Sequence, residues 1–179
     1  MKWLPLIACL WAAPLSAQSL CDVTDPDHIA AVLQGVWTQQ GSVSIETETL
    51  SVTQGLNPHD RVDVSRSLDL RWPLTDQWLR EALPLIATTP MDVDTVDDLL
   101  TTVDADWIAD AVGDTRCGPE NLPQYAATFD TGMATGDDTL SGTITLIPYF
   151  EDRVVLLAQI EMRGAWGLGF VTAASLLTR

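Results

Sequence analysis

The chain has 179 residues, a formal net charge of −16 at pH 7 and 46% hydrophobic residues. So negative a chain repels the phosphates of nucleic acids and of anionic lipid headgroups, which excludes nucleic acid as a partner. The length suits a single globular domain with a real hydrophobic core.

Residues 1–17 have the pattern of a cleavable signal peptide. Lys2 gives a positive start, an apolar stretch runs from Trp3 to Pro14, and Leu15-Ser16-Ala17 is a small-residue cleavage site. The apolar stretch is shorter than the ~20 residues of a membrane-spanning helix, so we expect no stable membrane span. We predict a periplasmic or secreted protein with one domain at residues 18–179. A lipoprotein signal is the alternative, because Leu6-Ile7-Ala8-Cys9 resembles a lipobox in which Cys9 is acylated.

A short helix is the first element predicted in this domain. Asp25 is a good N-cap, and Pro26 suits the first helical position. Gly35 is expected to end the helix. The apolar stripe at helical spacing consists of Ile29, Val32 and Leu33.

Two extended segments follow the helix. Residues 36–54 alternate apolar and polar side chains, with a phase shift that predicts a bulge or a tight hairpin. Residues 61–72 form the clearest strand, because one parity is apolar and the other polar. The face expected to be buried carries Val62, Val64, Leu68, Leu70 and Trp72.

The middle of the chain is predicted to be helical. One short helix begins at Thr75 or Asp76 and ends near Pro84. A second helix follows Pro90, and a third, short helical segment runs from Asp104 to Gly113. The second helix has a buried face at i, i+3, i+4, i+7 spacing, formed by Val96, Leu99, Leu100 and Val103.

The last third is predicted to be a β-meander. Alternating apolar residues indicate strands at 125–129, 140–146, 154–162 and from 165 to near the C-terminus. In the last strand we expect the face of Trp166, Leu168 and Phe170 to be buried. Its other face carries small residues, which allow a helix or ligand to approach closely.

These elements together predict an α+β fold. We expect a curved antiparallel sheet or partial barrel of about six strands, with an N-terminal helix and a helical insertion in the middle. Cys21 and Cys117 are the two cysteines outside residues 1–17, and two lone cysteines in an oxidising compartment most simply form a disulfide.

Motifs for catalysis or metal binding are weak. Asp130-Thr131-Gly132 resembles the Asp-Thr-Gly of aspartic proteases, but those enzymes need two such carboxylates and the chain has one copy. The only histidines, His28 and His59, have no nucleophile implied beside them, and no zinc motif occurs. We therefore expect no cofactor and no metal. Calcium binding by the acidic stretch from Asp92 to Asp114 stays open as an alternative, although the EF-hand pattern fails.

Gly35-Val36-Trp37, after a short helix, resembles the start of the lipocalins and related calycin barrels. In that family the tryptophan closes the base of the barrel and often stacks against an arginine of the last strand. The resemblance covers roughly residues 29–43. It implies a β-barrel, a closing role for Trp37 and a stacking partner in Arg163 or Arg179.

The sequence predicts an exported, non-enzymatic domain that binds a small apolar ligand or a partner protein. Of its seven tryptophans, all but Trp3 and Trp11 lie outside residues 1–17, and aromatic side chains can line an apolar pocket. The expected ligand-binding residues are Trp37, Trp72, Trp166 and Phe170. The alternative is a hydrolase of unrecognised type, in which His59 would meet a carboxylate and a hydroxyl nucleophile in a cleft.

Overall fold

The computed structural model describes residues 18–21, 23–76, 78–113, 117–131, 139–165 and 167–179. The expected signal peptide lies outside these ranges. The helices within them are α1 (Pro26–Leu33), α2 (Pro73–Asp76), α3 (Val93–Thr102), α4 (Trp107–Val112) and the 3-10 helix η1 (Pro119–Asn121). The strands are β1 (Gly35–Thr47), β2 (Ser51–Gly55), β3 (Arg61–Val64), β4 (Asp69–Arg71), β5 (Leu83–Pro84), β6 (Ile86–Thr88), β7 (Gln124–Asp130), β8 (Thr139–Phe150), β9 (Arg153–Gly164) and β10 (Gly167–Thr178).

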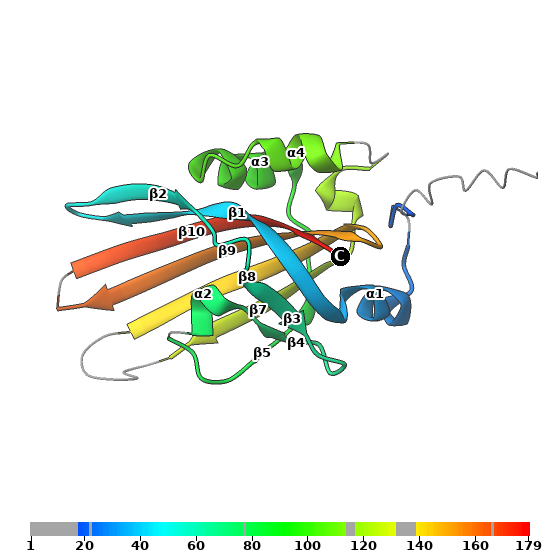
Figure 1. Ribbon diagram of the computed structural model, residues 1–179, viewed down its shortest axis with the longest axis horizontal. Helices are drawn as coiled ribbons and strands as arrows, with labels where there is room; N and C mark the ends of the chain where they lie inside the picture. The colour runs from blue at the N-terminus through cyan, green and yellow to red at the C-terminus, as the bar shows by residue number, and fades with distance from the viewer. Residues whose placement is uncertain (1–17, 22, 77, 114–116, 132–138, 166) are drawn as a thin grey trace, which may run out of the picture.

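These strands form one antiparallel sheet that nearly closes into a barrel (Figure 1). Their order is β5-β4-β3-β1-β10-β9-β8-β7-β6, and β2 makes an additional pair with β1. The two outermost strands, β5 and β6, are consecutive in the chain and separated only by Leu85. A single segment therefore pairs with β4 through residues 83–84 and with β7 through residues 86–88, which links the two edges of the sheet.

The expected α+β fold with about six strands is wrong, because the protein is mostly β and its sheet has ten strands. Strands β5 and β6 have two and three residues, too few to show an alternating pattern. The expected strand 61–72 is in fact two strands, because the chain reverses between Ser65 and Leu68, where Leu68 has a positive φ of 61°. The apolar side chains still share one buried face after this reversal, because Val64 lies directly opposite Leu70.

The expected N-terminal helix is confirmed as α1. The Asp25 carboxylate accepts a hydrogen bond from the N–H of Asp27 at 3.1 Å, and the predicted stripe is buried. The helix expected to reach Pro84 is wrong, because α2 ends at Asp76 and Leu83 belongs to β5. Leu83 pairs with β4 instead, where it helps to close the barrel.

Helices α3 and α4 form a layer outside the barrel wall, beside β1 and β10 in Figure 1. The predicted buried face of α3 is confirmed, and the hydroxyl of Ser42 in β1 donates to the Val103 carbonyl at 2.5 Å. Beneath this layer the outward-facing side chains of β8 and β9 are buried and apolar, as at Ile147, Val155 and Leu157. These two strands therefore carry continuous apolar runs rather than a simple alternation.

The predicted disulfide is confirmed. Cys21 and Cys117 are bonded, with their Cα atoms 5.9 Å apart and a sequence separation of 96. The bond ties the segment before α1 to the segment after α4. Next to it, Leu20 is fully buried and its N–H donates to the Tyr149 carbonyl of β8 at 3.0 Å. The described N-terminal segment is therefore bonded covalently to the segment after α4 and by a hydrogen bond to the barrel wall.

Candidate functional site

One end of the barrel is closed by α1, Trp37 and Arg179. The Trp37 indole is 1% exposed, and its N–H donates to the Leu33 carbonyl at the end of α1 at 2.9 Å. The Arg179 guanidinium lies over the Trp37 ring, 4.0 Å from its centroid, and donates to the carbonyls of Val32 and Gln34. Arg179 therefore binds the last turn of α1 and the ring at the same time.

Of the two arginines that the sequence resemblance named, Arg179 is the one that stacks on Trp37. Arg163 instead pairs with the Glu161 carboxylate at 2.6 Å on the exposed outer surface. Burial lowers the pKa of Arg179 from its ordinary value, although a guanidinium stays charged at neutral pH.

We expect Arg179→Lys to lower the free energy of unfolding by ~1–2 kcal/mol, because a lysine can neither stack a planar group on Trp37 nor reach both carbonyls with a fixed fork. Urea unfolding measures the loss. Arg163→Lys is the matched control, and an exposed ion pair of that kind should change stability by less than ~0.5 kcal/mol. Equal losses in the two variants would contradict the closing role of Arg179.

Trp72 is the second indole inside the barrel. It is fully buried, and its N–H donates to the side-chain carbonyl of Gln39 at 2.8 Å. Gln39 in turn donates to the Asn57 carbonyl at 3.1 Å. Because Trp37 and Trp72 are both buried with their N–H groups satisfied by the chain, they pack the closed end and form its floor.

The layer of inward-facing residues above this floor is also solid. Across five neighbouring strands the register aligns Val43, Ala173, Ala158, Ile144 and Ala127. All five side chains are buried, with at most 2% exposed. Three of them are alanines, which leaves room for large side chains within a small barrel.

The opposite end of the barrel has a different inner surface. Here the inward-facing residues are again apolar, yet Ile45, Phe129 and Met162 are only half-buried, and Val52 is 39% exposed. Val52 lies opposite Ile45, and Leu140 lies opposite Met162. We call Ile45, Val52, Phe129, Leu140 and Met162 the open-end row. Its members face inward, and all but Leu140, which is 9% exposed, are only partly covered by the described part of the chain.

Of the four expected ligand-binding residues, the structure brings two together. Trp37 and Trp72 share the interior near Gln39. Phe170 was expected on the buried face of the last strand, but the register places it opposite Glu46 on the outer surface, where it is 46% exposed. Trp166 lies outside the described residues. The inward face of β10 is instead the small-residue face, with Val171, Ala173 and Ser175 buried, because the indoles from other strands occupy the interior volume.

The open-end row could not be identified from the sequence. Alternation shows which residues share a face of a strand, but it does not show which end of the strand is covered by other residues. The signal available was position: Ile45, Phe129 and Met162 lie at the strand ends away from α1, and each has the parity of the buried face. Only the closed barrel shows that these three residues lie at the same end of it.

The titratable residues considered for catalysis are dispersed. His28 lies 3.8 Å from the Glu151 carboxylate at the surface, and His59 lies in an exposed turn. Asp130 is exposed at the end of β7, and Gly132 lies outside the described residues. Asp92, in the acidic stretch, caps α3, and its hydrogen bonds from Thr95 lower the pKa of the carboxyl. Among the described residues no three His, Cys, Asp or Glu side chains are placed to hold a metal ion.

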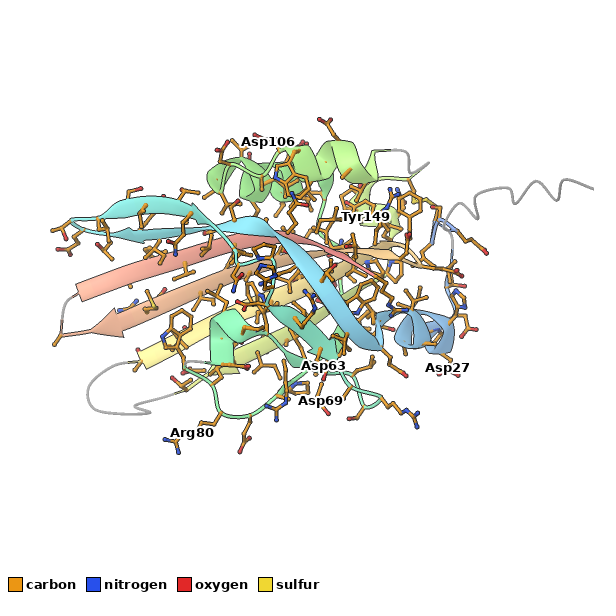
Figure 2. All side chains as sticks on the ribbon, in the orientation of Figure 1. Asp27, Asp63, Asp69, Arg80, Asp106 and Tyr149 are labelled. Atoms are coloured by element: carbon orange, nitrogen blue, oxygen red, sulfur yellow. A yellow bond between two sulfur atoms is a disulfide. The ribbon has the colours of Figure 1, made fainter. Side chains whose placement is uncertain are left out.

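Among the described residues, Tyr149 of β8 has the most strongly shifted pKa. It lies between the barrel wall and the helical layer and is 4% exposed (Figure 2). Burial raises the pKa of its hydroxyl to about 12, and the negative charges of Asp97 and Glu120 add to the shift. The hydroxyl is therefore strongly held in its neutral form.

This shift predicts a loss of stability at alkaline pH. In the unfolded chain the hydroxyl ionises near its ordinary pKa of 10.0, whereas in the folded chain it keeps its proton to about 12. The stabilisation is thus complete below pH 10 and is lost as the pH rises to 12, a loss on the order of 2 kcal/mol. Urea unfolding at pH 9 to 12 should show a steeper decline for the native chain than for Tyr149→Phe. Parallel pH curves would contradict the assignment.

The fold and this geometry define a nearly closed antiparallel β-barrel with an outer helical layer, one solid end and an opposite end whose apolar side chains are only partly covered by the described residues. Compared with protein-family models, with curated proteins and with solved structures, the chain matches none of them. No helix in the described ranges is both long and apolar enough to cross a membrane.

Proposed function

We propose that this protein is an exported, non-enzymatic, lipocalin-like module that binds a small apolar ligand at the open end of its barrel. The observation that carries the proposal is the open-end row: apolar side chains face inward there and keep part of their surface uncovered. In the neighbouring inward-facing layer, Val43, Ala173, Ala158, Ile144 and Ala127 are buried. An apolar ligand that covers the row would remove this surface from water, which is favourable by roughly 25 cal/mol per Å².

Two further features support the lipocalin-like part of the proposal. The chain has a short helix before the first strand, and the Trp37 ring is stacked against Arg179 just after the last strand. This is the arrangement that the resemblance at Gly35-Val36-Trp37 implies. The export part rests on residues 1–17 and on the disulfide, which is typical of oxidising compartments.

The charge of the chain favours a neutral ligand. A protein with a net charge of −16 repels carboxylates, so a long-chain alcohol or a sterol is a better candidate than a fatty acid anion. The solid floor formed by Trp37 and Trp72 limits how deeply such a ligand can enter.

The test is displacement of the neutral fluorescent probe N-phenyl-1-naphthylamine by dodecanol, cholesterol and dodecanoate. Ile45→Lys places a charge in the open-end row and should weaken binding of the probe and of dodecanol at least about tenfold. Phe170→Lys adds the same charge to the outer surface of the neighbouring strand and should leave binding unchanged. Absence of probe binding, or equal losses in both variants, would refute the open-end site.

The export part has its own test. Mass spectrometry of the protein recovered outside the cytoplasm should show an N-terminus at Gln18, after the small-residue site. A lipid adduct on Cys9 would replace the signal-peptide interpretation with the lipoprotein one.

A further inference from the structure

A second apolar space lies outside the barrel, between the helical layer and the barrel wall. It is a half-open pocket of about 150 Å³, bordered by α3 and α4 on one side, by β8 and β9 on the other, and by residues 117–119. Its walls are mainly aliphatic and include Val96, Leu100, Ile108, Ala109 and Val155. The register of β9 places Val155 on the outer face, so this pocket and the open-end row lie on opposite sides of the barrel wall.

One polar side chain at this pocket can bind a ligand. Tyr149 borders the pocket and is 4% exposed, and its hydroxyl is not among the buried polar atoms that lack a partner, so this atom reaches solvent and is accessible to a ligand. A phenolic hydroxyl can donate one hydrogen bond to a bound molecule. A ligand with a hydrogen-bond acceptor would accept this bond.

Size and charge narrow the class of ligand further. An apolar cavity of ~150 Å³ is large enough to bind benzene, so this pocket holds about one ring and not a long acyl chain. Asp97 borders the same pocket, and Glu120 follows Pro119, which also borders it. These two carboxylates disfavour an anion beside Tyr149.

We propose that this pocket binds a neutral molecule of about one ring that carries a hydrogen-bond acceptor, such as a small aromatic ketone, with the Tyr149 hydroxyl as the donor. The proposal is independent of the open-end site, because the two spaces share no residue. It also assigns a function to the apolar outer faces of β8 and β9 beyond seating the helices.

Three probes of similar size test the proposal by ligand-observed NMR titration of the disulfide-bonded domain. Acetophenone has a ring and an acceptor, ethylbenzene has the ring alone, and benzoate carries a negative charge. We expect acetophenone to bind more tightly than ethylbenzene, and benzoate to bind most weakly. Tyr149→Phe should weaken acetophenone binding about 3- to 10-fold, the value of one hydrogen bond, and leave ethylbenzene unchanged.

Two further variants locate the binding site. Ala109→Phe fills the pocket from α4 and should abolish binding of acetophenone and ethylbenzene, whereas Ile45→Lys at the open end should leave both unchanged. The far-ultraviolet circular dichroism of each variant shows that it is folded. The proposal fails if acetophenone does not bind the folded native chain, if Ile45→Lys removes its binding, or if Tyr149→Phe weakens both neutral probes equally.

Discussion

Replacing Trp37 by alanine should lower the free energy of unfolding by ~3–5 kcal/mol. The Trp37 side chain is 1% exposed, so its removal leaves a cavity at the closed end of the barrel. The substitution also removes the hydrogen bond to the Leu33 carbonyl and the ring beneath Arg179. Both of these interactions join α1 to the barrel, so α1 should also be held less firmly against the barrel. Urea unfolding followed by circular dichroism measures the change in stability.

Trp107→Ala is the matched control for this substitution. Trp107 lies in α4 and is 37% exposed, so truncating it creates no enclosed cavity. We expect its cost to be about 1 kcal/mol or less. If Trp107→Ala and Trp37→Ala destabilise the protein equally, the closed end is not the packed base that the structure shows.

The second large effect is expected at Gly41, in the middle of β1. A Cβ atom added there would lie 2.0 Å from the Ala174 carbonyl oxygen and 2.6 Å from the Ser175 Cα, both in β10. These are backbone atoms of the paired strand, so they cannot move aside without breaking the β1–β10 ladder. We expect Gly41→Ala to cost at least ~3 kcal/mol or to prevent folding. Thermal unfolding and the yield of folded protein measure the effect.

Gly55→Ala in β2 is the control for Gly41→Ala. Gly55 is exposed, and the nearest atom to an added Cβ is the Gly41 carbonyl oxygen at 3.9 Å. Its replacement should change stability by no more than ~0.5 kcal/mol. A large loss at Gly55 together with a small one at Gly41 would show that the strand register differs from the one described.

The barrel wall is apolar on both its inner and its outer surface, and the two surfaces pack against different parts of the protein. In β9 the even-numbered residues, such as Ala158 and Ile160, face the interior, and the odd-numbered Val155 and Leu157 lie beneath the helical layer. Only toward the end of the strand, near Met162, does the inner surface remain partly uncovered. One strand therefore contributes to the packed core, to the outer pocket and to the open-end row.

Features that depend only on neighbouring residues could be predicted from the amino-acid sequence. Asp25 and Pro26 define the start of α1, the alternation from Arg61 to Trp72 defines a buried face, and the helical spacing from Val96 to Leu100 defines the inner face of α3. Each of these arises from the period of a helix or a strand, which local residues set. The Cys21–Cys117 bond was also predictable, because only two cysteines lie outside residues 1–17.

How these elements close into a barrel, and where the barrel leaves free space, depends on contacts between residues that are distant in sequence. Residues 83–88 are too short and irregular to predict as strands, yet their pairing with both β4 and β7 links the edges of the sheet. The choice of Arg179 over Arg163, and of Val171 over Phe170 as the inward residue of β10, depends on which distant groups fill the interior. Alternation assigns residues to two faces but cannot say which face is inside, because the volume taken by Trp37 and Trp72 comes from other strands. The open-end row and the outer pocket likewise exist only once side chains far apart in the sequence share one space.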